Sequence, residues 1–165
     1  MGDRVLPQKA RTAWSRLRGR FFHLLFVLRR PMTFGVRGLV LDRETNSVLL
    51  VRHTYVPGFQ LPGGGVETGE TALEALEREL HEEGNIRLTA RPELKSVHFN
   101  RHASKRDHVL LYLVTGFSQD GAKRADREIA EAEFFPADNL PADTTAGTRR
   151  RIAEILDGQD ASPYW

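Results

Sequence analysis

Three glutamates near the middle of the chain have a spacing that is compatible with a metal site. Glu79, Glu82 and Glu83 fall within residues 71–83, whose apolar positions predict a helix. At about 100° per residue, the three carboxylates share one sector of that helix. Like charges at this spacing destabilise an isolated helix, but a bound hard cation offsets the repulsion, and oxygen ligands alone favour Mg²⁺ or Mn²⁺. From the helix spacing alone, an ordinary solvated face is the favoured interpretation, because charge runs usually are solvated.

The segment before this helix is rich in glycine. Gly63, Gly64 and Gly65 let the backbone approach a phosphate, or a metal through a carbonyl oxygen. Glu70 stands at the junction between this segment and the helix, and Arg78 follows two helical turns later. We expect Glu70 and Arg78 to form an ion pair that braces the segment against the helix.

These residues match a known pattern. The box of the Nudix hydrolase family reads G-x5-E-x7-R-E-U-x-E-E-x-G-U, where U is a bulky aliphatic residue. The chain resembles it at Gly64, Glu70, residues 78–83 and Ile86, so that eight of the nine specified positions match. The flanking segments 59–62 and 128–141 are also similar to the family, which extends the resemblance to about residues 35–156.

The exception is Asn85, which stands where the family has glycine. A residue directly after a helix is often left-handed, and asparagine is the next best residue there after glycine. We therefore interpret Asn85 as a tolerated helix cap that leaves the carboxylates unaffected.

The resemblance implies hydrolysis of a phosphoanhydride bond in a nucleoside diphosphate linked to another group X. A nucleoside triphosphate or a nucleotide sugar is the expected small-molecule substrate. Mg²⁺ is the expected cofactor and Mn²⁺ the alternative. The divalent ion would neutralise the pyrophosphate, lower the pKa of the attacking water and align the attack.

The resemblance also implies roles for the box residues. Glu79, Glu82 and Glu83 are expected metal ligands, with the Gly64 carbonyl as a further, backbone ligand. Glu79 or Glu82 is expected to take the proton from the attacking water. Arg78 would orient the carboxylates.

Four further expectations concern Glu70 and residues outside the box. Glu70 would support Arg78. Relatives add one acid from outside the box as a metal ligand, and Glu128 is the first choice here, ahead of Glu131 and Asp107. In the two strands predicted before the box, Arg37 and Arg52 would contact phosphates. Tyr55 or Phe59 would stack on a base, with packing in the core as the alternative for each ring.

The elements that must position these residues alternate between strands and helices. Strands are predicted at 34–41, 48–53, 94–100, 109–117 and 132–136, and helices at 71–83 and 145–156. Thr71 and Glu74 form a predicted capping box at the start of the first of these helices. This order predicts an α/β or α+β domain. The resemblance makes it an α/β/α sandwich with a mixed β-sheet, the Nudix hydrolase domain, over residues 34–160.

The composition of the chain excludes several kinds of site. The 165 residues carry a formal net charge of +2 and no cysteine, which excludes disulfides, thiolate metal sites and a cysteine nucleophile. The longest apolar run, over 21–28, is far shorter than the roughly 20 residues that span a bilayer. We expect a cytoplasmic location.

The small net charge is unevenly distributed. Residues 1–37 hold nine basic residues and one acid, a net charge of +8, and the rest of the chain carries −6. Residues 1–33 are predicted to form a basic N-terminal segment with an amphipathic helix over 10–28. Three interpretations remain open: packing, including a homodimer contact, which we favour; an anionic membrane surface; and RNA.

A second function class competes with the hydrolase. The same fold could bind a nucleotide without cleaving it, as a non-catalytic nucleotide-sensing module. Such a module is expected to lose box carboxylates, and this chain keeps Glu79, Glu82 and Glu83. A membrane- or RNA-associated pyrophosphohydrolase is a variant in which the N-terminal segment matters.

Overall fold

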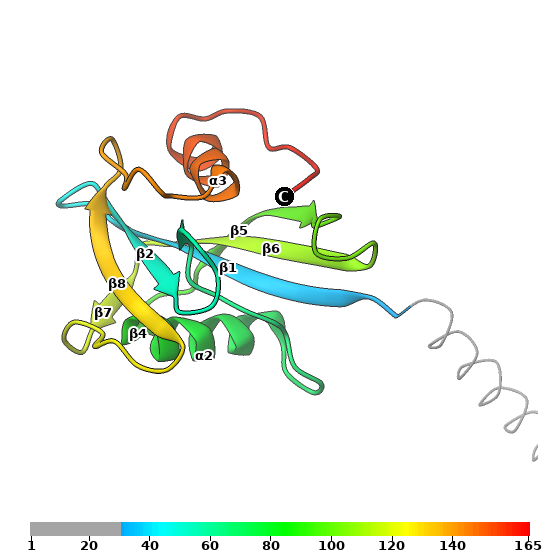
Figure 1. The fold of residues 1–165 in the computed structure, drawn as a ribbon, viewed down its shortest axis with the longest axis horizontal. Coiled ribbons are helices and arrows are strands. Elements are labelled where there is room, and N and C mark those ends of the chain that lie inside the picture. Colours follow the sequence, from blue (N-terminus) through cyan, green and yellow to red (C-terminus); the bar gives the residue numbers. More distant parts are fainter. Residues whose placement is uncertain (1–30) are drawn as a thin grey trace, which may run out of the picture. The chain divides into compact units, whose positions relative to one another are not determined.

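The computed structural model of the chain describes residues 31–165 (Figure 1). The strands are β1 (Thr33–Asp42), β2 (Ser47–His53), β3 (Phe59–Gln60), β4 (Ile86–Leu88), β5 (Glu93–Phe99), β6 (Asp107–Val114), β7 (Phe117–Gln119) and β8 (Ile129–Pro136). The helices are α2 (Ala72–Gly84) and α3 (Ala146–Leu156). The helix predicted over 10–28, and with it the proposed homodimer contact, lies outside the described residues.

Six strands form a mixed sheet between two helices, and β4 pairs with β7 in a separate two-stranded sheet. The order of the six-stranded sheet is β3-β2-β1-β6-β5, and β2 also pairs with β8. β1 runs parallel to β6, whereas β2 is antiparallel to β1, β3 and β8, and β5 is antiparallel to β6. Helix α2 covers one face of the sheet and α3 the other (Figure 1). The predicted fold class, α+β with a mixed sheet, is confirmed.

Alternate residues of β1 face the two helices. Val36 and Val40 are buried in one core cluster with Leu76 and Leu80 of α2. Leu39, on the opposite face, is buried in a second cluster with Ile152 of α3. This period-two burial is expected of a central strand with a helix on each face. It fixes the apolar edge of α2 against the sheet and turns the glutamate edge to the side.

Both ends of α2 are capped as the sequence predicts. The Thr71 hydroxyl accepts from the Glu74 amide at 3.2 Å, and the Thr71 amide donates to the Glu74 carboxylate at 2.8 Å. Asn85 has φ 54° and ψ 30°, the left-handed conformation, and its amide donates to the His81 carbonyl at 3.0 Å. The cap interpretation of Asn85 is confirmed.

The structure adds features that the sequence did not indicate. The short strands β3, β4 and β7 were not predicted. The compact unit runs from Thr33 to Trp165, five residues beyond the predicted end of the domain. The Phe99 amide donates to the Pro163 carbonyl at 2.8 Å, and the Trp165 amide donates to the Phe99 carbonyl at 3.1 Å. The last residues therefore pack along β5.

Within residues 31–165, no helix is long and apolar enough to cross a membrane. The cytoplasmic location stays a prediction.

Candidate active site

The glycine-rich segment is held against β1 by backbone hydrogen bonds. The Val36 amide donates to the Gly64 carbonyl at 2.8 Å, and the Gly38 amide donates to the Pro62 carbonyl at 2.9 Å. Gly63 has φ +137°, and a Cβ at this position would lie 2.1 Å from the Val36 carbonyl oxygen. Only glycine satisfies both conditions. One lone pair of the Gly64 carbonyl, the predicted backbone ligand, is therefore used by β1.

Arg78 joins this segment to α2. Its Nε and Nη2 donate to the two carboxylate oxygens of Glu70 at 2.9 and 3.1 Å, and Nη2 also donates to the Gly65 carbonyl at 3.1 Å. The expected ion pair between Glu70 and Arg78 is present, in the bidentate form that fixes both groups most firmly. The Arg78 guanidinium lowers the pKa of Glu70.

Arg78 also contacts two of the predicted metal ligands. Its Nη1 donates to Glu79 Oε1 at 2.7 Å and to Glu82 Oε2 at 3.4 Å. The Glu82 side chain is 59% exposed, whereas Glu79 is mostly covered. A Cβ on Gly64 would lie 2.3 Å from Glu79 Oε1, so the absence of a side chain at Gly64 makes room for this carboxylate.

Glu83 is the buried member of the cluster, only 7% exposed. Its Oε2 accepts from the Gly63 amide at 2.7 Å, and its Oε1 lies 3.3 Å from His53 Nε2. Burial raises the pKa of Glu83 to about 7, against the lowering effect of the Gly63 amide and the Arg37 charge. The negative charges of Glu79 and Glu128 add to the increase.

His53 is a site residue that the sequence analysis missed. It ends β2 directly before the segment rich in proline and glycine, and that position was its one signal. Burial lowers the pKa of His53, with a further lowering by Arg37.

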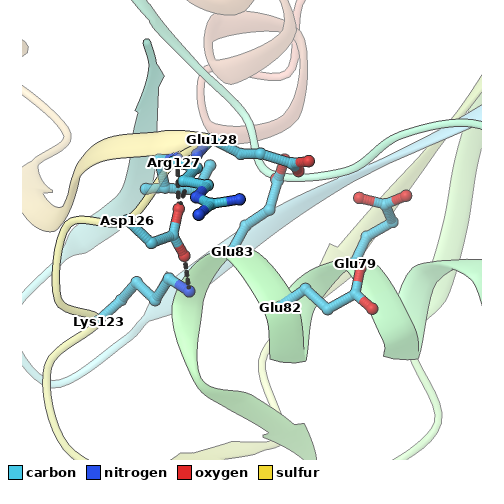
Figure 2. A pocket seen from close by; sticks show the side chains of 8 residues that line it. Glu79, Glu82, Glu83, Lys123, Asp126, Arg127 and Glu128 are labelled. Atoms are coloured by element: carbon cyan, nitrogen blue, oxygen red, sulfur yellow. Dashed lines mark hydrogen bonds and ion pairs between the residues drawn. The ribbon is translucent and has the colours of Figure 1, made fainter.

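The helix glutamates and the loop between β7 and β8 enclose a pocket of about 510 Å³ (Figure 2). Its lining residues are Glu79, Glu82, Glu83, Lys123, Asp126, Arg127, Glu128 and Ile129. All four predicted carboxylate ligands thus face one space. As these side chains stand, no three metal-ligating groups of residues 31–165 converge closely enough to hold an ion. Arg78 holds Glu79, and the Gly63 amide holds Glu83.

The two arginines that were predicted to contact phosphates, Arg37 and Arg52, both contact other groups of the protein. Arg37 Nη1 donates to the Leu61 carbonyl at 2.8 Å, and burial lowers the pKa of Arg37. Arg52 Nη2 lies 3.2 Å from Asp143 and 3.6 Å from Glu131. The charge of Arg52 is therefore largely balanced by Asp143 and Glu131. The charge of Arg37 instead lowers the pKa of Glu83.

The two candidate stacking rings differ. Phe59 is 2% exposed, with Phe135 edge-on at 5.0 Å and the Arg52 guanidinium over its ring at 4.3 Å. Stacking of Phe59 on a base is therefore corrected to the alternative, packing, because no face of the ring is open. Tyr55 is 68% exposed, and its ring centroid lies 5.3 Å from that of His53. Its ring therefore remains available to stack on a base.

Comparison with known proteins agrees with this architecture. A sequence model of the NUDIX domain matches residues 32–155. The chain belongs to the Nudix hydrolase family. In the solved structure of a MutT NUDIX hydrolase from Burkholderia pseudomallei, the same fold matches with a TM-score of 0.63 and 26% identity, covering 75% of this chain and 98% of that one.

Two curated relatives carry substrate names. An ADP-ribose pyrophosphatase from Methanocaldococcus jannaschii is 36% identical over 110 residues, 65% of this chain and 63% of that protein. An 8-oxo-dGDP phosphatase from Homo sapiens is 31% identical over 131 residues, 78% of this chain and 40% of that protein. The chain thus spans less than two thirds of the length of either relative.

Proposed function

We propose that this Nudix protein hydrolyses a phosphoanhydride bond in a nucleoside diphosphate linked to X, with Mg²⁺ or Mn²⁺ as cofactor. A nucleoside triphosphate or nucleotide-sugar type of substrate is the class proposed. The observation that carries the proposal is that Glu79, Glu82, Glu83 and Glu128 line one pocket. The names of the two curated relatives add ADP-ribose and 8-oxo-dGDP as compounds to test.

The residues of the pocket fit a hard divalent cation. All four donors are carboxylates, the ligand type that Mg²⁺ and Mn²⁺ prefer. Besides burial, the negative charges of Glu79 and Glu128 act on Glu83 and help to raise its pKa, and this repulsion is what a bound cation would relieve. When bound, the ion supplies charge neutralisation and lowers the pKa of a water. Arg78 contacts only Oε1 of Glu79, so the other oxygen of this carboxylate has no bond to Arg78.

The chain's own groups then have distinct tasks. Glu79 or Glu82 accepts the proton of the attacking water. Arg78, held by Glu70, keeps these two carboxylates oriented. Tyr55 is proposed to stack on the base of the substrate because its ring is exposed. Arg37 is proposed to balance the negative charge of Glu83.

The alternative, a nucleotide sensor without turnover, is less well supported. The box carboxylates are retained, and Glu79, Glu82 and Glu83 face a pocket that a ligand can enter. Roles for a membrane surface, RNA or a homodimer rest on residues 1–33, most of which the structure does not describe.

The test is hydrolysis over a panel of ADP-ribose, 8-oxo-dGDP, nucleoside triphosphates and nucleotide sugars, each with Mg²⁺ or Mn²⁺. Wild type is compared with Glu79→Gln and Glu82→Gln, and Glu77→Gln is the matched control because Glu77 is exposed on α2 outside this pocket. Loss of the general base is expected to lower kcat by about 10²–10⁴-fold.

Three results are informative. A large loss in at least one of the two box variants, with Glu77→Gln unaffected, supports the proposal. Unchanged activity in both box variants would overturn the site assignment. Binding of a nucleotide by wild type with no turnover of any compound would overturn the enzyme and favour the sensor.

A further inference from the structure

The wall of the pocket opposite α2 is a rigid loop. In the loop between β7 and β8, Asp126 Oδ1 accepts from the amides of Glu128 and Ile129 at 2.9 and 2.8 Å. Asp126 Oδ2 pairs with Lys123 Nζ at 2.5 Å, and the Asp126 amide donates to the Ile129 carbonyl at 2.8 Å. These bonds lower the pKa of Asp126. The loop is therefore shaped by its own side chains.

The same loop is fastened to the end of β2. The Thr54 hydroxyl donates to the Arg127 carbonyl at 2.8 Å, and the Thr54 amide donates to the Glu128 carbonyl at 2.9 Å. The backbone of Arg127 is thus fixed on both sides. A side chain on such a backbone is presented to the pocket from a defined point.

The Arg127 side chain has no partner among the described residues, although it lines the pocket. The other cations near the glutamates are engaged: Lys123 with Asp126, and Arg78 with Glu70 and Glu79. Figure 2 shows the Arg127 guanidinium extending from the loop into the space that the glutamates border. The Arg127 guanidinium is thus exposed and faces the acidic wall, on a backbone that hydrogen bonds hold in place.

A phosphate group is a suitable partner for the Arg127 guanidinium. A guanidinium offers two parallel N–H donors that match two phosphate oxygens, and such charge-assisted bonds are among the strongest in proteins. On the proposed function, the glutamates would hold a cation that neutralises part of the pyrophosphate charge, and Arg127 would be free to contact the remaining phosphate oxygens.

We propose that Arg127 is a substrate-binding residue that holds phosphate oxygens across the pocket from the α2 glutamates. This inference rests on the proposed function for the identity of the substrate. It commits to ligands with at least two linked phosphates, because one group must reach the metal wall while another reaches Arg127.

The same loop offers a matched control. Arg124 is also exposed and lies three residues earlier, but it borders a different hollow, with Asn85 and Asp120, and does not line the glutamate pocket. Arg124→Ala therefore removes one positive charge from the same loop without removing a group from the pocket.

The experiment compares wild type, Arg127→Ala, Arg127→Lys and Arg124→Ala in the full chain. Calorimetry measures binding of α,β-methylene-ADP and of inorganic pyrophosphate with Mg²⁺, and kinetics on a substrate from the panel separates KM from kcat. Arg127→Ala is expected to raise Kd and KM by about 10- to 100-fold, the loss of one charge-assisted contact. Arg127→Lys should recover part of this, with kcat and thermal midpoint nearly constant.

Equal Kd values for wild type and Arg127→Ala would overturn the inference, as would an equal weakening by Arg124→Ala, which would show a general charge effect. The inference would also be overturned if wild type bound neither α,β-methylene-ADP nor inorganic pyrophosphate. Probe binding that depends on Arg127 in a protein without turnover would instead sustain this inference and remove the hydrolase proposal.

Discussion

At the scale of single residues, the charge balance of the pocket depends on Arg78. One guanidinium contacts three carboxylates, those of Glu70, Glu79 and Glu82. Its bond to Glu70 is bidentate and partly covered, whereas its contact with Glu82 is long and exposed. Arg78 can therefore stay anchored to Glu70 while Glu79 and Glu82 exchange partners, which makes Glu70 part of the site's support.

Arg78→Lys tests this anchoring. A lysine cannot form the bidentate bond, so we expect catalytic activity to fall by on the order of 10-fold or more, and Glu70→Gln to have a similar effect. Because both changes break the same pair, the double variant should lose little more than either single variant, measured as kcat/KM in a double-mutant cycle. Fully additive losses would contradict the role of Glu70 as a support for Arg78.

Gly64→Ala tests the space beside Glu79. The three atoms nearest to the new Cβ all belong to the Glu79 carboxylate, the flexible end of a side chain, so the fold should tolerate the change while the carboxylate is displaced. We expect activity to fall by on the order of 100-fold, as for other small misplacements of a catalytic group, with little change in thermal midpoint.

Gly63→Ala provides the contrast one residue earlier. Its Cβ would meet the backbone of β1 at a positive φ, so the free energy of unfolding should fall by about 1–3 kcal/mol or more. Similar thermal midpoints for the two alanine variants would contradict this distinction.

The site residues differ in how far the sequence could reveal them. Glu70, Arg78 and the three helix glutamates were predictable because their types and spacing resemble the family box, and α2 then fixes the relative positions of Arg78 and the glutamates. His53 and Arg127 were not, because they come from separate strands and loops that meet α2 only in the folded sheet. Phe59 was misassigned as a stacking candidate because burial of a ring depends on neighbours, here Phe135, that are distant in sequence.

At the scale of elements, the end of α2 is set by Asn85. Its left-handed backbone ends the helix, and its Nδ2 donates to the Gly121 and Ala122 carbonyls at 3.4 Å each. The cap thereby also contacts the loop that forms the opposite wall of the pocket.

Substitution at Asn85 should separate these contributions. Asn85→Val is expected to lower the free energy of unfolding by about 1–2 kcal/mol, because a β-branched residue is strained in the left-handed region. Asn85→Gly should change it by less than about 1 kcal/mol and leave activity intact. Urea denaturation measures both, and equal losses in the two variants would show that the backbone conformation is not the cause.

Long elements were predicted to within a few residues, whereas the short ones were not. β1, β2, α2 and α3 carry strong periodicity, turns or caps of their own. β3, β4 and β7 have two or three residues each and exist because a partner strand is nearby. Local sequence holds too little information to specify such strands.

At the scale of the whole molecule, a buried polar cluster ties α3, β5 and the last residues together. His98 Nδ1 lies 2.6 Å from Arg151 Nη1 and 2.7 Å from the Ser162 carbonyl, and Arg151 pairs with Glu154. His98 and Arg151 are both fully buried. Nothing in the sequence near His98 indicates this burial, which depends on the chain end returning to β5.

This cluster predicts a pH dependence of stability. Burial and the Arg151 charge lower the pKa of His98 below its usual 6.5. Below pH of about 6.5 the unfolded chain binds a proton at His98 that the folded protein does not, so stability should fall as the pH falls through that value, by up to about 1.4 kcal/mol per pH unit.

His98→Gln should remove this contribution and flatten the pH dependence of the unfolding free energy, measured by urea denaturation between pH 5 and 8. The exposed His102 provides the control for loss of a histidine, as His102→Gln. A slope that His98→Gln leaves unchanged would contradict the assignment.

The parallel pairing of β1 with β6 has a consequence for the order of folding. It joins residues 74 apart in the chain, such as Thr33 and Asp107, and the entropy of closing so long a loop is lost before the paired strands gain contacts. α2, with local contacts and a complete cap, can form on a microsecond scale without it. The glycine-rich segment, however, is bonded to β1, so during refolding helical structure should return first and nucleotide binding only when the two distant strands have met.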